Sequence, residues 1–539
     1  MKKLLLVLIS LTLVLCTTAC GGDNGDKAKT AEIKGNGYGG EIVLNLTTKG
    51  EEIVDIEVVS NHETEPVFER AFPLLKERIL AAQSPVVDNV SGATFMSFAI
   101  KKAIADEMKA QGKDFGEITM TTEPEHEKKQ LDNVTTDLLI VGAGPAGIAS
   151  ALSAKEHGVE NVILIEKLDI LSGNGKFDQD FNRLYNSKQT QIEGTNMTKE
   201  EFIASREGKF DSPERVQAWA DKAWDLDEWL RAQGTELNYI IPGSVNDHMA
   251  EFDKYAGNEI QTNMEKALAK TDVDVRTGTK GLDLIFDGDK VVGVKVESRD
   301  GYYDINAKAV ILSTGGFSWN KELLNKYAPG HDDWMTSNQM GATGDFVPVF
   351  EAHNFGLGQM DRLVEFANVI LPERHLTGGA NGYVRVTKDG VNAKKGPETA
   401  YYITDQGGYD SHWRIQKHTS QGFYTKYETL KELADGTGIN YDALLNTITE
   451  YNAKRAESGS RQLATEVGPF YVCPTVSMVH MTLGGVMANG QAQVLTADNQ
   501  VVEGLYAAGE VVATDSMYAG AVVFGRVAGE ATAQYILGE

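Results

Sequence analysis

The sequence predicts an α/β protein with a Rossmann-type nucleotide-binding domain, preceded by a smaller α+β domain. A buried-type strand at 137–141 leads into the glycine-rich segment 142–147, a helical stretch and a second apolar strand, an order typical of nucleotide-binding folds. Closer to the N-terminus, two runs with alternating polarity, 41–47 and 52–59, flank a glycine turn and predict a β-hairpin. Helical segments follow the hairpin, so the smaller domain combines strands and helices.

The glycine-rich segment has the spacing that a dinucleotide requires. Gly142, Gly144 and Gly147, with Ala146 between them, let the backbone approach a pyrophosphate, which binds at the positive N-terminus of the following helix. Glu166 closes the second strand 24 residues after Gly142, where a carboxylate can accept hydrogen bonds from a ribose. We therefore expect a bound nucleotide; a purely structural glycine turn is the alternative.

The first residues resemble the leader of a bacterial lipoprotein. Lys2 and Lys3 precede an apolar run at 4–15 that is too short to span a membrane permanently, and Cys20 follows small residues. We expect a signal peptide at 1–19, a lipid on Cys20, a short tether at 20–30 and an extracytoplasmic, membrane-anchored protein. The alternative is an ordinary signal peptide with a chance cysteine.

Charge and cysteine usage restrict the function. The formal net charge is −26, which argues against a nucleic-acid partner and is typical of a soluble surface. Of the three cysteines, one lies in the predicted leader, Cys20 is the expected lipidation site, and Cys473 is the remaining thiol. No internal disulfide, c-type haem site or four-cysteine iron–sulfur set is therefore expected, and a redox cofactor must be organic.

Four further segments, 313–317, 341–345, 504–510 and 524–529, resemble the fumarate reductase and flavocytochrome c flavoproteins. The resemblance covers 134–365 and 474–539, and it implies an FAD-binding domain in two parts around an inserted α+β capping domain at 366–473 that closes over substrate. It also implies that the adenosine half of FAD lies on the glycine-rich segment and that the ribityl chain contacts Glu510. The other cofactor-binding positions that it implies are Gly315, Asp345, Gly509 and Val523.

The segment 88–94 resembles the attachment motif of FMN-binding domains in electron-translocating complexes and extracellular flavoproteins. The domain is expected at 31–120, and the polar, charged residues that follow, with Pro124, indicate a linker at 121–133. The resemblance implies that FMN is joined to Thr94 through a phosphodiester bond by a flavin transferase. The alternative is that Ser91 or Thr94 simply caps the following helix.

The catalytic residues of the family are only partly present. Residues 479–485 match a family segment that contacts substrate; they keep its first histidine as His480 but have Met481 in place of the second. The family's cap histidine would fall near Asn368. No arginine lies between Arg385 and Arg414, where the family's proton donor is expected, and none lies between Glu510 and Arg526, where a second carboxylate-binding arginine is expected.

Substitutes for the missing arginines can be proposed from the sequence. Arg374, His375 and Arg385 are candidate positive groups in the cap, although a solvated surface position is the alternative for each. Tyr518 can donate a hydrogen bond to a substrate carbonyl or act as an acid; a packed core tyrosine is the alternative. Because a buried carboxylate without a partner is costly, we expect a poor fit for fumarate.

These features predict a reductase that passes electrons from a membrane-linked donor through FMN and FAD to a small organic acceptor, an activated alkene other than fumarate. One alternative is a flavin dehydrogenase acting on an enone-type or ring-ketone substrate. Another is a non-enzymatic relay that only transfers electrons between flavins and a partner.

Overall fold

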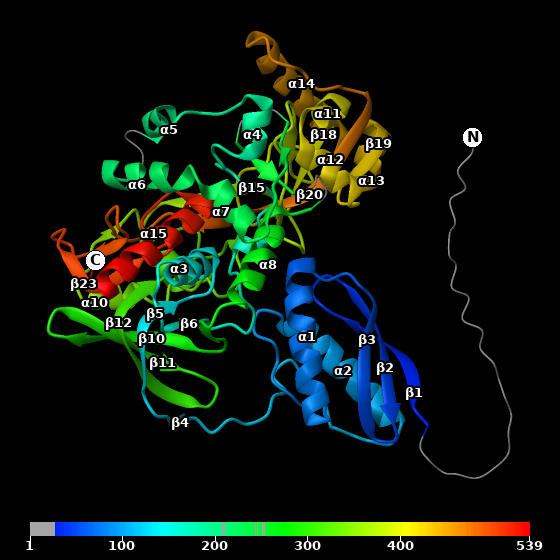
Figure 1. The fold of residues 1–539 in the computed structure, drawn as a ribbon. Coiled ribbons are helices and arrows are strands. Elements are labelled where there is room, and N and C mark those ends of the chain that lie inside the picture. The colour runs from blue at the N-terminus through cyan, green and yellow to red at the C-terminus, as the bar shows by residue number, and fades with distance from the viewer. Residues whose placement is uncertain (1–26, 207–210, 243, 245, 251–253, 539) are drawn as a thin grey trace, which may run out of the picture.

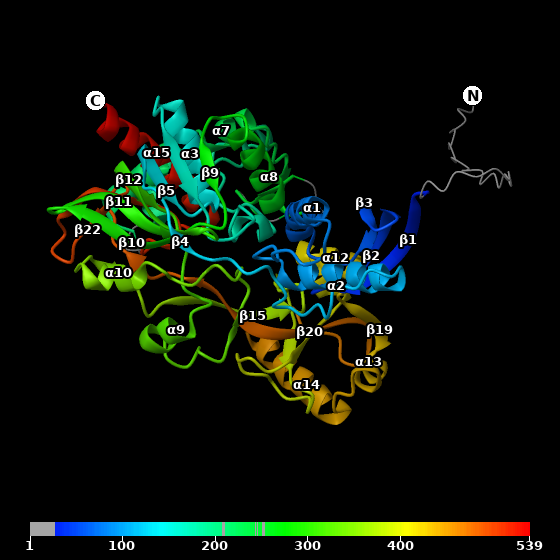
Figure 2. The same ribbon diagram turned by 90° about the horizontal axis from the view of Figure 1, so that it is seen from below.

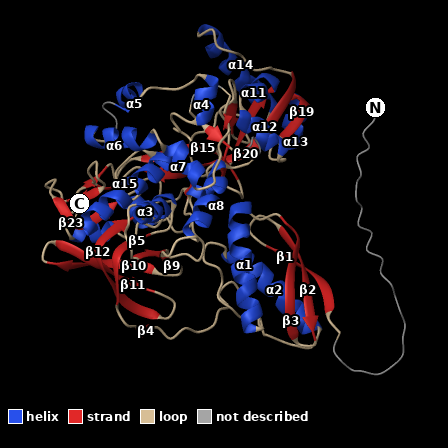
Figure 3. Cartoon of the chain, viewed as in Figure 1, coloured by secondary structure: helices blue, strands red, loops and turns tan. Residues whose placement is uncertain are grey.

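A computed structural model describes residues 27–206, 211–242, 244, 246–250 and 254–538. Figure 1 shows a small N-terminal domain in blue, a larger nucleotide-binding domain that contains both cyan-green and red segments, and a cap in yellow and orange. Figure 3 shows that helices and strands alternate through the two larger parts. This arrangement confirms the predicted α/β fold with an inserted α+β cap.

In the described part of the N-terminal domain, a three-stranded antiparallel sheet of order β1-β2-β3 packs against two helices. Ile42, Leu44 and Leu46 alternate along β2 and are buried against the helices, as the predicted hairpin requires. β1 was not predicted: Lys29 already pairs with Thr48, so the tether is shorter than 20–30. The elements are β1 (Lys29–Asn36), β2 (Glu41–Lys49), β3 (Glu52–Asn61), α1 (Glu65–Ala82) and α2 (Thr94–Ala110).

The nucleotide-binding domain is built on a sheet that has nine strands within the described residues. Its centre is parallel, with β5 between β12 and β6, which confirms the predicted strand–helix–strand unit. The end of the linker joins this sheet, because Lys129 in β4 pairs with Gly301 in β12. The strands are β4 (Lys129–Gln130), β5 (Val134–Val141), β6 (Val162–Ile165), β9 (Asp274–Arg276), β10 (Lys280–Asp287), β11 (Lys290–Glu297), β12 (Gly301–Leu312), β22 (Gln493–Leu495) and β23 (Val501–Ala507).

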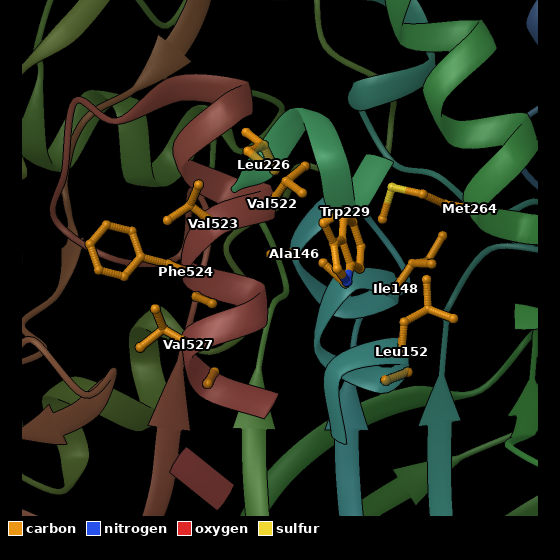
Figure 4. Close-up of a cluster of buried hydrophobic side chains, with 14 of the residues drawn as sticks. Ala146, Ile148, Leu152, Leu226, Trp229, Met264, Val522, Val523, Phe524 and Val527 are labelled. Carbon is orange, nitrogen blue, oxygen red and sulfur yellow. The ribbon is translucent and has the colours of Figure 1, made fainter. Parts of the chain in front are cut away.

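Helices α3 (Pro145–Glu156) and α15 (Met517–Leu537) pack closely together over this sheet. A Cβ atom at Gly525 would lie 2.4 Å from the Ala146 carbonyl oxygen, and one at Gly529 would lie 2.5 Å from that of Ser150. Only glycine therefore permits this approach. Figure 4 shows α15 beside α3, with Val523 and Phe524 on the side of α15 away from α3 and Ile148 and Leu152 on the far side of α3.

The remaining helices and short strands of this domain surround the sheet. They are η1 (Gly175–Phe177), α4 (Lys188–Glu193), α5 (Lys199–Arg206), α6 (Pro213–Ala223), α7 (Leu226–Ala232), β7 (Tyr239–Ile240), β8 (His248–Met249), α8 (Ala256–Leu268), α9 (Lys321–Tyr327), α10 (Val347–Ala352), β14 (Leu357–Gly358) and β21 (Gly485–Val486).

The cap does not end where the sequence suggested. Strand β20 (Val467–Thr482) pairs with cap strands on both sides and continues past residue 473 without a break, so 474–482 extend the cap sheet as well as leading back to the nucleotide-binding domain. The cap boundary therefore lies within a strand. The other elements of this sheet and its cover are β13 (Met335–Thr336), β15 (Leu363–Ile370), β16 (His375–Leu376), β17 (Val384–Val386), β18 (Ala400–Asp405), α11 (Gln406–Ser411), α12 (Trp413–Ser420), β19 (Thr425–Thr429), α13 (Leu430–Thr437) and α14 (Tyr441–Glu457).

The N-terminal domain contacts the nucleotide-binding domain through α1 and α8, which lie next to each other in Figures 1 and 2. Arg70 of α1 donates to Asn258, Thr262 and Glu265 of α8, at 2.9, 3.1 and 2.8 Å. Ile170 of the nucleotide-binding domain is buried in the apolar core of the N-terminal domain. The two domains therefore share both polar and apolar contacts.

None of the described helices combines the length and the apolar character that a membrane span requires. The predicted leader and Cys20 lie outside the described residues.

Candidate active site

The glycine-rich loop has the geometry of a nucleotide site. Gly142 has φ of +98°, and a Cβ there would lie 2.5 Å from the Ser313 carbonyl oxygen; one at Gly147 would lie 1.9 Å from that of Gly142. Gly144 is the residue before α3, and Ala146 lies in the first turn. Glu166 accepts from the backbone N–H of Ala143 at 2.9 Å, so its carboxylate supports the loop.

The predicted cofactor positions on other segments meet at the same place. Gly315 has φ of +75° with open space where a Cβ would lie, and Gly509 (φ +83°) packs on Ala146. Asp345 accepts from Lys167 at 2.5 Å and pairs with Lys280 at 3.0 Å.

Glu510 and Val523 have different outcomes. Glu510 accepts from the backbone N–H of Thr482 at 3.0 Å, and burial raises the pKa of its carboxyl to about 7. Val523 does not line the site, because its side chain is fully buried in the apolar core that includes α15 and α3 (Figure 4).

One cavity of about 1010 Å³ joins the three parts of the molecule. The glycine loop, Glu166, Gly315 and Glu510 form one region of its wall. The N-terminal domain, the cap and β20 form the rest; their lining residues include Tyr38, Thr94, Phe95, Arg374, Arg414 and His480. The space beside Gly144 and Gly315, together with the positive N-terminus of α3, fits the adenosine and pyrophosphate of FAD.

Thr94 lies where a tethered flavin would reach this cavity. It is the first residue of α2, and the preceding Ala93 gives no side-chain cap, so neither Ser91 nor Thr94 acts as the helix cap that the sequence left open. No hydrogen bond joins the Thr94 hydroxyl to another group in the described part of the chain. A half-buried hydroxyl at a helix N-terminus fits the phosphate of FMN.

His480 is fixed at the cap side of the cavity. Its Nδ1 lies 2.7 Å from Ser337 Oγ, and its ring meets Phe366 edge-to-face with centroids 4.8 Å apart. Burial, with a smaller effect from Arg414, lowers the pKa of His480 to about 4. The imidazole is therefore neutral near pH 7 and can exchange hydrogen bonds with an uncharged or anionic group.

Arg374 is the cavity guanidinium for which no carboxylate partner is found among the described residues. Its guanidinium donates to the Asn338 carbonyl at 2.7 Å, while its buried Nε has no hydrogen-bond partner. Its backbone has φ of +62°, an uncommon conformation for arginine. Arg374 and His480 are brought together because both contact the segment 336–338.

The other proposed cations are placed differently. Arg385 is not part of the cavity wall: its guanidinium donates to the Lys394 carbonyl and to Ser477 Oγ, within the cap. His375 lines the cavity beside the Tyr255 hydroxyl, 3.0 Å from Nδ1, but burial lowers its pKa to about 4, so it is not a positive group.

Tyr518 lines the cavity, yet its hydroxyl accepts from Gln261 Nε2 at 2.7 Å and its ring stacks edge-to-face on Phe181. No contact between Tyr518 and His480 is present in the described structure. The geometry resembles a packed tyrosine more closely than a free acid.

Sequence reasoning missed Arg414 and Tyr255. Arg414 is the second residue of α12, lines the cavity and pairs with Asp180 at 2.8 Å. Arg414 comes directly after the long stretch without arginine that follows Arg385. The amphipathic helix after His412 is the sequence signal that could have indicated it. Tyr255 lies just before α8, far from the cap in sequence.

The site is that of a two-flavin oxidoreductase. It has a nucleotide-binding loop before α3, a threonine hydroxyl at the start of α2, and one cavity that both of them line. The chain belongs to the FAD-binding domain family, whose model matches residues 137–522, and an FMN-binding domain matches 37–109. Both predicted cofactors, FAD and FMN, are thereby confirmed.

Known proteins resemble most of the chain. It is 28% identical to the urocanate reductase of Eggerthella lenta, over 95% of this chain and 93% of that protein. It is 27% identical to an NADH:fumarate oxidoreductase of Klebsiella pneumoniae over 92% of its length, but spans only 57% of that relative. The solved open conformation of a flavocytochrome c3 fumarate reductase aligns over 75% of this chain and 79% of its own, with 29% identity and a TM-score of 0.65.

Proposed function

We propose that the chain is a flavin-dependent reductase that transfers electrons from FMN on Thr94 to FAD and then to the C=C bond of a small organic acceptor. The single observation that carries this proposal is the shared cavity, which joins Thr94, the FAD loop and the Arg374–His480 pair. The names of the similar proteins, which include a urocanate reductase and a fumarate oxidoreductase, support a C=C acceptor.

The acceptor would carry one carboxylate or carbonyl group. Arg374 can bind that group through Nε and its remaining N–H donors, and His480 can hold it from the Ser337 side. Arg414 is already paired with Asp180, so within the described part of the cavity Arg374 is the guanidinium without a carboxylate partner, and it can bind one anionic end. This supports the exclusion of fumarate, which has two carboxylates.

The chemistry requires two hydrogens. FAD held by the Gly142–Gly147 loop and Glu510 would supply, in its reduced form, the hydride for one alkene carbon. The other carbon takes a proton, and the Tyr255 hydroxyl at the cavity wall, 3.0 Å from His375 Nδ1, is the group that would donate it; the proton is then replaced from solvent. Arg374 stabilises the negative charge that develops on the acceptor's carbonyl oxygen.

We further propose that the protein works outside the cytoplasm. The leader with Cys20 supports a lipid anchor, and a covalent FMN would not diffuse away there. The electrons would come from a membrane-linked donor, and a flavin transferase would attach the FMN.

An anaerobic acceptor screen tests the proposal. The FMN-loaded protein is reduced chemically, and flavin reoxidation is followed with monocarboxylate enoates, aromatic enoates, enones and fumarate. Reoxidation by an enoate with one carboxylate is expected to exceed that by fumarate. Rapid reoxidation by fumarate would overturn the substrate assignment, while oxidation of a saturated ring ketone by the oxidised protein would favour the dehydrogenase alternative.

The relay alternative has less support. A protein that only passes electrons does not need a cavity of this size lined by an arginine with a free Nε and by a histidine at its cap side. Absence of reoxidation by every organic acceptor would revive it.

A further inference from the structure

Asp169 belongs to the nucleotide-binding domain, three residues after Glu166, yet its hydrogen bonds hold the flavin-attachment loop of the N-terminal domain. The backbone N–H and the hydroxyl of Ser91 donate to Asp169 Oδ2 at 2.7 and 2.9 Å. In return, the Asp169 backbone N–H donates to Ser91 Oγ at 2.9 Å. The two loops are thus joined by three short bonds.

Two arginines compensate the charge of this carboxylate, whose side chain is only 2% exposed. Arg78 of the N-terminal domain lies 3.0 Å from Oδ1, and Arg299 of the nucleotide-binding domain donates to both oxygens at 2.7 Å. Burial alone would raise the pKa of Asp169, but the bond from Ser91 and the two guanidiniums hold it below its usual range. A buried carboxylate with this many partners is strongly tied to one geometry.

Apolar packing also positions the flavin-attachment loop against the nucleotide-binding domain. A Cβ at Gly92, whose φ is +98°, would lie 3.1 Å from the Ile170 side chain, so the loop rests directly on the residue after Asp169. Thr94 follows two residues later and lines the shared cavity. The position of Thr94 relative to the FAD loop therefore depends on this contact.

We propose that Asp169 is a positioning residue for electron transfer between the two flavins, because it fixes the Thr94 loop against the segment that follows Glu166. This inference rests on the proposed function. Each transfer oxidises reduced FMN and reduces FAD by the same number of electrons, with protons exchanged with solvent. Displacement of the loop lengthens the separation and slows the transfer.

The second contact between the domains makes the test specific. Arg70 and Glu265 join α1 to α8 away from the attachment loop, so the domains stay associated when Asp169 is altered. Asp169→Asn keeps the size of the side chain but removes the charge and one acceptor, and it lies outside the attachment motif, so flavinylation of Thr94 is unaffected. Glu265→Gln is the matched control.

The experiment measures the transfer directly. FMN- and FAD-loaded protein is reduced by a light flash with a deazaflavin photosensitiser, and the movement of electrons to FAD is followed by absorbance. We expect Asp169→Asn to slow this phase by about tenfold or more, with both flavins retained, and Glu265→Gln to leave it within about twofold. Asp169→Glu is expected to recover part of the rate.

A second readout needs no flavin. In flavin-free protein, the Ser91 amide is expected to exchange hydrogen faster in Asp169→Asn than in wild type, at equal melting temperature. Unchanged Ser91 exchange, or an unchanged transfer rate with both flavins bound, overturns the role of Asp169. Wild-type protein without FMN on Thr94 instead overturns the proposed function, and the exchange result still decides whether Asp169 fixes the loop.

Discussion

Helices α2 and α3 both begin at the wall of the same cavity, and each follows a glycine with φ of +98°, Gly92 and Gly142. The supports of these two glycines differ. Gly142 is packed against Ser313 and is followed by Ala143, which Glu166 binds, all within one domain. Gly92 rests on Ile170, across the domain interface. The FAD loop is thus complete in its own domain, whereas the FMN loop is completed by its neighbour.

Removal of FMN, with FAD retained, is expected to change turnover more than any other substitution considered below. Thr94→Ala should abolish the covalent FMN and leave FAD bound, because the two loops do not share ligands. Intact-mass measurement after co-expression with a flavin transferase checks the FMN, and absorbance checks the FAD. The variant should still react with a small artificial donor but lose turnover with the membrane-linked donor.

Thr94→Ser is the matched control, since it keeps a hydroxyl at the helix N-terminus. A wild-type mass without added FMN, with the transferase present, would contradict the assignment. Full activity of Thr94→Ala with the membrane-linked donor would show that FMN is dispensable.

The acceptor site, like the FMN loop, is assembled from separate segments of the chain. Arg374→Gln should remove a charged hydrogen-bond donor to the acceptor, a loss of about 1.5–3 kcal/mol, or roughly 10- to 150-fold in kcat/KM. Arg385→Gln is the matched control, because its guanidinium bonds within the cap. Steady-state rates with the best acceptor from the screen check both, and equal effects would place the acceptor elsewhere.

A smaller effect is expected at His480, whose neutral ring contributes an uncharged hydrogen bond. His480→Ala should lower kcat/KM by roughly 5- to 10-fold, about 1–1.4 kcal/mol, with FAD content unchanged. Tyr518→Phe should change turnover less than this, and should mainly lower the melting temperature because it removes the oxygen that accepts from Gln261 Nε2. A larger kinetic loss for Tyr518→Phe would restore its role as an acid.

The last prediction concerns Glu510 in flavin-free protein and affects stability rather than turnover. Its pKa is raised by burial from 4.5 to about 7, so the folded state keeps a proton that the unfolded state releases. The stabilisation is complete below pH 4.5 and is lost as the pH rises to about 7. Denaturant unfolding at several pH values should show this decline, and Glu510→Gln should flatten it; equal slopes would contradict a protonated Glu510.

The contiguous motifs were predictable from the sequence, and the assembled sites were not. Residues 142–147 fix a local backbone shape, so their glycines could be assigned directly, and the resemblance of 88–94 to a flavin-attachment motif implied Thr94. Arg414 and Tyr255 reach the cavity only through the packing of α12 and the segment before α8. No local pattern indicates that contact.

The errors have the same origin. Val523 was assigned to the cofactor site from its position in a family segment, but the rotation of α15 turns it into the core. Arg385 was chosen for its charge, yet its strand register directs it to Ser477. The bond between Asp169 and Ser91 joins positions 78 residues apart and has no sequence signature.

Strand β20 has a mechanical consequence. It is hydrogen-bonded along the cap sheet from Phe470 to Thr482, and His480 is one of its residues. A rotation of the cap as a rigid body would carry the imidazole with it, and with it the Phe366 ring of β15. Arg374 follows β15 and would move in the same direction. Cap orientation and the placement of the acceptor's polar end are therefore a single degree of freedom.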